Sequence, residues 1–198
     1  MAITANQITN FRIACVPLIA FCICIEGRLW TTLGFILFVL AGISDWYDGY
    51  LARTTNTTSV FGRVFDSIAD KLLVGGSMLA LAYVGRFGNG LIFAALIILL
   101  REIFIAGLRE YVIRLQAEKQ LEETEEKIHQ TLATTDLARL KAVLQMVSIG
   151  MLIIAPYLLH PYFGMVGGFV FWASAALSAY TGWQYWQEAR PAIHAGLI

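Results

Sequence analysis

The sequence predicts an all-α, polytopic membrane protein with six transmembrane helices. Hydrophobic residues make up 58% of the 198-residue chain and charged residues only 14%, whereas soluble domains carry about 25% charged residues. A chain of this length cannot bury so much apolar surface in one water-soluble core, but a lipid bilayer accommodates apolar side chains on the protein surface. The net charge of +0 provides no basic surface for nucleic acid, so no nucleic-acid partner is expected.

Six segments are apolar and long enough to cross a bilayer, for which a helix needs ~20 mostly apolar residues. Several contain charged residues, so a simple hydropathy threshold is expected to miss two or three of them. The glycine-rich residues 85–90 predict a turn, and His160-Pro161 predicts a break in the chain. The expected spans, within a single domain 1–198, are residues 8–26, 30–52, 63–84, 89–114, 138–159 and 162–187.

Two further segments are interpreted without assigning chemistry to them. The acidic stretch at about 116–137 is a solvated helical or loop connector. The first apolar run lacks a basic region before it and is read as a retained span rather than a signal peptide. It contains all the cysteines, whose odd number on one helix favours packing roles over disulfides: Cys15, Cys22 and Cys24.

The distribution of basic residues predicts the orientation in the membrane. Six spans place both termini on the same side, and the positive-inside rule makes that side the cytoplasm. We therefore expect a multi-pass protein of the cytoplasmic (inner) membrane. The opposite side holds only Arg28 and Arg86, whereas the cytoplasmic side holds Arg53, Arg63, Arg114, Lys119, Lys127, Arg139 and Arg190.

Ionisable residues inside the expected spans are the functional candidates. Each costs several kcal/mol in a bilayer unless it is paired, hydrated or metal-bound. They are Arg12, Asp45, Asp48, Asp66, Asp70, Lys71, Arg101, Glu102, Arg109 and Glu110.

The four aspartates form two pairs with helical spacing. Asp45 and Asp48 are three residues apart, and Asp66 and Asp70 are four apart, so each pair shares a helix face. A short loop joins the two spans near their cytoplasmic ends, which makes them expected neighbours with four facing carboxylates. Such carboxylates repel one another strongly, and two divalent cations offset their charge. Oxygen ligands favour Mg²⁺ or Mn²⁺ over Zn²⁺.

Alternatives to a metal site stay open at this point. Each carboxylate can instead pair with its own cation, and Lys71 and Arg53 are close in sequence. A more remote alternative is a metal-ion transporter, although its acids would be spread across the bilayer depth. Gly49 and Gly62 on the acidic faces leave room for a ligand, but small residues also mark helix packing in membranes.

Eight positions of this stretch resemble, in residue type and spacing, the complete signature of the CDP-alcohol phosphotransferase family. The resemblance implies six transmembrane helices, a homodimer, and a cytoplasm-facing two-metal site that binds a CDP-linked donor. The signature reads Asp45-x2-Asp48-Gly49-x2-Ala52-Arg53-x8-Gly62-x3-Asp66-x3-Asp70.

The resemblance also implies roles for these residues. Asp45, Asp48, Asp66 and Asp70 would bind the two Mg²⁺ or Mn²⁺ ions, with Asp66 and Asp70 catalytic and Asp70 the general base. The residues implied in CDP binding are Asp48, Gly49, Ala52, Arg53 and Gly62.

Three other segments resemble the bacterial branch of the family that makes phosphatidylglycerophosphate. The implied substrates are CDP-diacylglycerol and sn-glycerol 3-phosphate, with membrane lipids around the protein. The family's usual Gly-Lys reads Ala138-Arg139 here, and the Thr that follows the lysine reads Ala142. The segments are Asn6-Gln7-Ile8-Thr9-x-Phe11-Arg12, Arg101-Glu102-x5-Leu108-Arg109-Glu110 and Lys141-x3-Gln145-Met146.

The acceptor alcohol depends on the basic residues near the proposed metals. Arg109, Arg139 and Lys141 are expected to bind the acceptor's phosphate, although ordinary flanking charge explains them too. Arg101 and Glu102 are expected to form a structural ion pair, and Arg12 either contacts a phosphate or pairs with an acid. Other transferases of the family, which make phosphatidylserine, phosphatidylinositol phosphate or cardiolipin, remain alternatives.

Overall fold

The protein is described by a computed structural model. Some side chains within its helices are not described, among them those of residues 45–64 and 66. The described residues are 5–25, 27–55, 60–88, 90–119, 136–158, 160 and 162–196.

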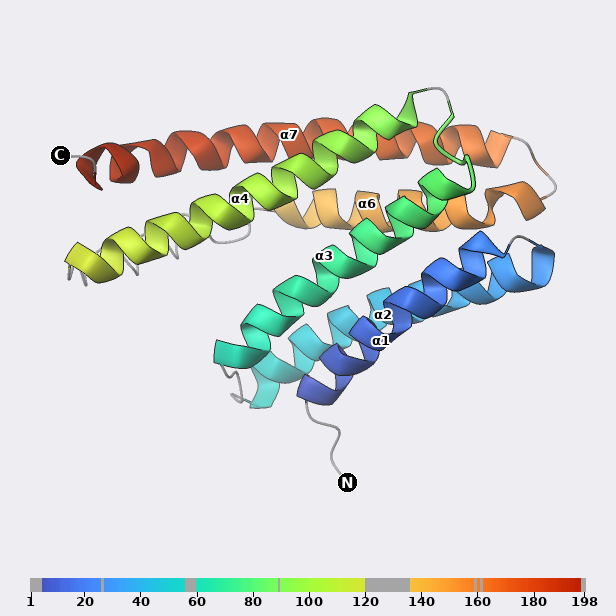
Figure 1. Ribbon diagram of the computed structural model, residues 1–198, viewed down its shortest axis with the longest axis horizontal. Helices are drawn as coiled ribbons and strands as arrows, with labels where there is room; N and C mark the ends of the chain where they lie inside the picture. Colours follow the sequence, from blue (N-terminus) through green and yellow to red (C-terminus); the bar gives the residue numbers. More distant parts are fainter. Residues whose placement is uncertain are drawn as a thin grey trace. The chain divides into compact units, whose positions relative to one another are not determined.

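Six long helices and one short 3₁₀ helix make up the described chain, which contains no strand (Figure 1). The all-α prediction is confirmed, and each expected span corresponds to one long helix. The helices are α1 (Ala5–Cys24), α2 (Arg28–Thr55), α3 (Val60–Tyr83), α4 (Leu91–Lys119), α6 (Asp136–Ile154) and α7 (Tyr162–Gly196), with η1 (Ala155–Tyr157) after α6.

Several helices extend beyond the limits that hydrophobicity suggested. Helix α4 continues to Lys119 rather than ending at 114, and α7 continues to Gly196 rather than 187. Residues 116–119 read Gln-Ala-Glu-Lys, all of which are strong helix formers, so the helix continues after the apolar stretch has ended. The first residues of the expected connector are therefore helical, and residues 120–135 lie outside the described chain.

Three helices of the described chain are long and apolar enough to be recognised as membrane spans by length and hydropathy. Among the described residues these are Leu91–Val112, Arg139–Tyr157 and Tyr162–Pro191, with Thr9–Cys24 and Arg28–Ser44 as shorter apolar helices. The described parts of α1 and α2 thus contain apolar stretches that are shorter than a full span.

The connections around α3, α4 and α7 contain the predicted turns. Gly85 and Gly90 have φ values of 70° and 80°, in the left-handed region that glycine adopts without strain. Arg86 between them donates from Nη1 to the carbonyl oxygen of Ile153, 3.3 Å away, and so satisfies an acceptor at the end of α6. His160 is not helical, which confirms the break before α7, although Pro161 lies outside the described residues.

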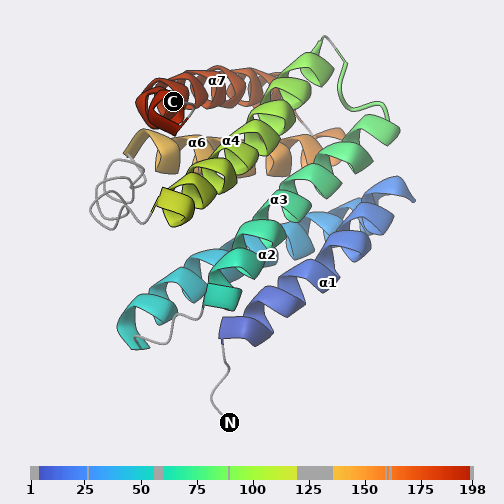
Figure 2. The ribbon, with the colours of Figure 1, turned by 60° about the vertical axis from the view of Figure 1, so that its left-hand side comes forward.

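The structure divides into two compact units, which are described separately. Unit 1 comprises Met1–Ile92 and Met146–Phe169, and unit 2 comprises Phe93–Gln145 and Val170–Ile198. In unit 1, α1 packs against both α2 and α3 (Figure 2). Helices α2 and α3 also contact each other, as expected, but to a much smaller extent.

The core of unit 1 is largely apolar and includes two of the three cysteines of α1. Ile19, Ile23 and Leu73 are buried there, and the thiols of Cys15 and Cys22 lie among such residues. All three cysteines are free in the structure. In unit 2, residues of α4 and α7 form a second buried cluster: Ile105, Leu108, Val112, Tyr185 and Ala189.

Close packing of α1 against α3 leads to a stability prediction. A Cβ added at Gly76 would lie 2.7 Å from Val16 Cγ1, and valine is too stiff at χ1 to move away. We expect Gly76→Leu to lower the free energy of unfolding by about 2 kcal/mol or more through overpacking. Thermal unfolding in detergent measures this. Gly107→Leu on α4 is the control, because nothing lies within 4 Å of a Cβ there; equal losses in both variants contradict the prediction.

Candidate active site

The aspartate pairs lie on helical backbone, as their spacing predicted. Asp45 and Asp48 belong to α2, and Asp66 and Asp70 belong to α3. Of these four side chains, only that of Asp70 is described. The expectation that the four carboxylates face one another therefore stays a prediction, as do the CDP contacts of Gly49, Ala52, Arg53 and Gly62, which fall outside the described side chains.

Asp70 is held by an arginine from another helix. Arg12 Nη1 on α1 donates to Asp70 Oδ1 over 2.7 Å. The Arg12 side chain is 0% exposed, whereas that of Asp70 is 50% exposed. Of the two roles left open for Arg12, the structure thus shows the pair with an acid. A charge-assisted hydrogen bond of this length fixes the carboxylate, and the exposed half of the side chain leaves it accessible.

Lys71, the residue after Asp70, is not the cation that pairs with the Asp70 carboxylate. Lys71 is exposed, and its Nζ donates to Ser67 Oγ over 3.2 Å. The alternative in which a carboxylate pairs with a cation therefore applies to Asp70, but with Arg12 as the partner.

The described part of the acidic stretch contributes one carboxylate that is accessible to a cation, that of Asp70. The donor set expected there consists of carboxylates alone, which suits Mg²⁺ or Mn²⁺. The accessible carboxylate of Asp70 belongs to the same helix as Asp66, and the two residues are four positions apart. Among the side chains that the structure describes, no group of three or more His, Cys, Asp or Glu residues comes together, so the complete ligand set remains a prediction.

A second polar cluster lies in unit 2. Arg101 Nη1 donates to Glu102 Oε1 over 3.1 Å, which confirms the predicted ion pair. Lys141 Nζ on α6 donates to the same Glu102 oxygen, and Arg101 Nη2 donates to Thr181 Oγ1 on α7 over 3.2 Å. The sequence contains no signal for Thr181, because its contact depends on how α7 packs against α4.

The three candidates for the acceptor phosphate differ in their surroundings. Lys141 is only 7% exposed, whereas Arg109 on α4 and Arg139 on α6 are exposed. Glu110, next to Arg109, pairs with Arg114 over 2.9 Å, an exposed pair of the kind that contributes little to stability. Convergence of the three candidates on one phosphate stays a prediction.

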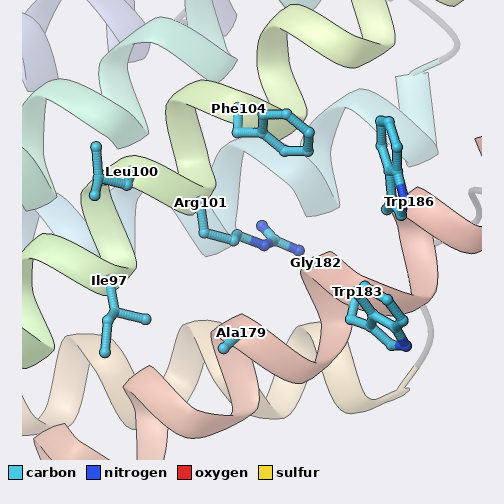
Figure 3. A pocket seen from close by; sticks show the side chains of 8 residues that line it. All are labelled: Ile97, Leu100, Arg101, Phe104, Ala179, Gly182, Trp183 and Trp186. Carbon is cyan, nitrogen blue, oxygen red and sulfur yellow. The ribbon is translucent and has the colours of Figure 1, made fainter.

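An open, largely apolar groove of about 580 Å³ lies between α4 and α7 in unit 2. Figure 3 shows the Arg101 side chain at this groove, with aromatic rings of both helices around it. Two of the aromatic residues of the last span thus line a groove, while Tyr185 belongs to the core. The lining residues are Ile97, Leu100, Arg101, Phe104, Ala179, Gly182, Trp183 and Trp186.

Comparison with known proteins matches residues 2–180 to the family model described as CDP-alcohol phosphatidyltransferase. Three relatives named CDP-diacylglycerol–glycerol-3-phosphate 3-phosphatidyltransferase are similar over almost their whole length. The Rickettsia typhi protein is 34% identical, covering 93% of this chain and 96% of the relative. The Cereibacter sphaeroides protein is 29% identical, with 94% and 95% covered. The Salmonella choleraesuis protein is 27% identical, with 92% of both chains covered.

Proposed function

Because the chain belongs to the CDP-alcohol phosphatidyltransferase family, we propose that it is a phospholipid-synthesising enzyme that transfers the phosphatidyl group of CDP-diacylglycerol to sn-glycerol 3-phosphate. The products are phosphatidylglycerophosphate and CMP. The observation that carries this proposal is the similarity to relatives named for that reaction, which extends over 93% of the chain. The eight-position signature at Asp45–Asp70 supports the CDP-linked donor.

Asp70 is the general base of the proposed reaction. It accepts the proton of the acceptor's primary hydroxyl, whose oxygen then forms a bond to the phosphorus on the diacylglycerol side. The bond from this phosphorus to the CMP oxygen breaks, and CMP leaves. Arg12 keeps the Asp70 carboxylate in place during the transfer, because the two are joined over 2.7 Å.

The other signature residues hold the donor. Asp45, Asp48, Asp66 and Asp70 would hold two Mg²⁺ or Mn²⁺ ions, which would supply charge stabilisation for the pyrophosphate and for the departing CMP. Beside them, Asp48, Gly49, Ala52, Arg53 and Gly62 bind CDP.

The acceptor's phosphate needs positive charge. Arg109, Arg139 and Lys141 are proposed to supply it, and Lys141 is the one of the three that is buried. The other acceptors used in the family differ from glycerol 3-phosphate in the position of the phosphate or in the alcohol that reacts. The three basic residues are therefore proposed to determine which acceptor the enzyme uses.

We further propose a homodimer in the cytoplasmic (inner) membrane with both termini and the active site facing the cytoplasm. The apolar helices support insertion in a membrane, and the excess of Arg and Lys in the loops on one side supports the orientation.

The decisive experiment is an acceptor panel with the purified protein, CDP-diacylglycerol and Mg²⁺. We expect CMP release with glycerol 3-phosphate, and none with serine, inositol phosphate or phosphatidylglycerol. Release with one of the other acceptors alone rejects the proposed acceptor. No release with any acceptor, combined with metal flux into proteoliposomes, favours a transporter instead.

A further inference from the structure

A continuous line of polar contacts joins three helices in unit 2. It runs from Thr181 on α7 through Arg101 and Glu102 on α4 to Lys141 on α6. Both ends are buried, since Thr181 is 6% and Lys141 is 7% exposed. Polar groups in a membrane span are costly unless they are paired or functional, so this line needs an explanation.

We propose that Thr181, Arg101 and Glu102 are positioning residues that hold the Lys141 ammonium where it binds the phosphate of the acceptor. The inference rests on the proposed function, which assigns Lys141 to that phosphate, and adds a role for residues in two other helices. Thr181 lies just beyond residues 2–180, the part matched by the family model.

The lysine needs such positioning because of its chemistry. An ammonium on a four-carbon stem is a point charge with many rotamers, unlike the planar guanidinium of arginine. It has three N–H donors. The contact with Glu102 Oε1 uses one donor and fixes the direction of the stem, while the ammonium keeps further donors for an oxyanion.

Glu102 is itself held in place by Arg101. Its Oε1 accepts from both Arg101 and Lys141, so a shift of the arginine moves the carboxylate and with it the lysine. These three side chains carry two positive charges and one negative charge. The formal charges of these three side chains leave a surplus of about +1, which attracts an anion.

Thr181 fixes Arg101 by a directed hydrogen bond. Its hydroxyl lies 2.9 Å from the Leu177 carbonyl oxygen on its own helix. A hydroxyl has one proton, so donating it to this carbonyl leaves the lone pairs to accept from Arg101 Nη2. Gly182 beside it lets α7 approach closely, because a Cβ there would lie 2.8 Å from Arg101 Cγ.

The test is a comparison of Thr181→Val with Thr181→Ser. Valine keeps the shape but removes the acceptor, and serine keeps the hydroxyl. We expect Thr181→Val to raise the KM for glycerol 3-phosphate about fivefold to tenfold. The kcat and the KM for CDP-diacylglycerol should change less than about twofold, and serine should restore the acceptor KM.

A matched control shows whether the rise in the KM for glycerol 3-phosphate is specific to Thr181 or follows from removing any helical threonine hydroxyl. Thr32 Oγ1 on α2 also donates to a carbonyl four residues earlier, that of Arg28. Thr32→Val should therefore leave both KM values unchanged. Thermal shift by glycerol 3-phosphate provides a second readout, since binding raises the melting temperature, and the shift should shrink in Thr181→Val and not in Thr32→Val.

The outcomes distinguish this inference from the proposed function. An unchanged acceptor KM in Thr181→Val overturns the positioning role, as does an equal rise in both KM values together with a lower melting temperature in the absence of ligand. A wild-type protein that releases CMP only with another acceptor instead rejects the proposed acceptor, before any variant is made.

Discussion

Asp70→Asn is expected to lower kcat for CMP release about a thousandfold or more, because a positioned general base contributes roughly 10²–10⁴ in rate and the same carboxylate is a proposed metal ligand. The amide has nearly the same shape but does not accept the proton. Half of the Asp70 side chain is exposed, so the substitution should leave the fold intact. The measurement is CMP release under saturating substrates, with the melting temperature as a check on folding.

Glu188→Gln is the matched control for this substitution. Glu188 is an exposed residue on α7, the chemical change is the same, and we expect activity close to that of the wild type. An Asp70→Asn protein that retains more than about a tenth of the wild-type kcat contradicts the base assignment. If the wild-type protein releases no CMP and instead shows metal flux in proteoliposomes that Asp70→Asn abolishes, the enzyme interpretation itself is wrong.

The position of Asp70 on a membrane helix follows from local sequence alone. Spacings of three and four residues have the period of the α-helix, and the apolar runs around them have the length of a span. Both are properties of neighbouring residues. The length of an apolar run predicts the ends of a helix less well. Helix formers such as Glu118 and Lys119 extend α4 past the end of its apolar stretch.

The partners of the charged residues did not follow from sequence. Lys71 is adjacent to Asp70, but neighbouring residues on a helix do not face each other. Arg12 is 58 residues away, and only the packing of α1 against α3 brings it to the carboxylate. In the same way, Thr181 is 80 residues from Arg101, and a hydroxyl in an apolar span has many other acceptable partners.

Arg12→Met is expected to lower kcat by about 30- to 100-fold. Without the arginine, the half-exposed Asp70 carboxylate loses the hydrogen bond that orients it for proton transfer. A loss of about 2–3 kcal/mol in transition-state stabilisation corresponds to that loss in rate. Methionine fills much of the buried volume of Arg12, so the melting temperature should fall less than in Arg12→Ala. Arg12→Lys keeps the charge but not the planar donors, and should lose about tenfold.

A double-mutant cycle decides whether Arg12 acts through Asp70. If the arginine only positions this carboxylate, adding Arg12→Met to Asp70→Asn should lower kcat little further, because the group it positions is already inactive. Residues that act as one unit are strongly non-additive in this way. If Arg12 instead contacts the substrate's phosphate, the two losses should multiply, and the double variant should be about 30- to 100-fold slower than Asp70→Asn alone. The contact of 2.7 Å between Arg12 Nη1 and Asp70 Oδ1 favours the first outcome, since it places the arginine on the base itself.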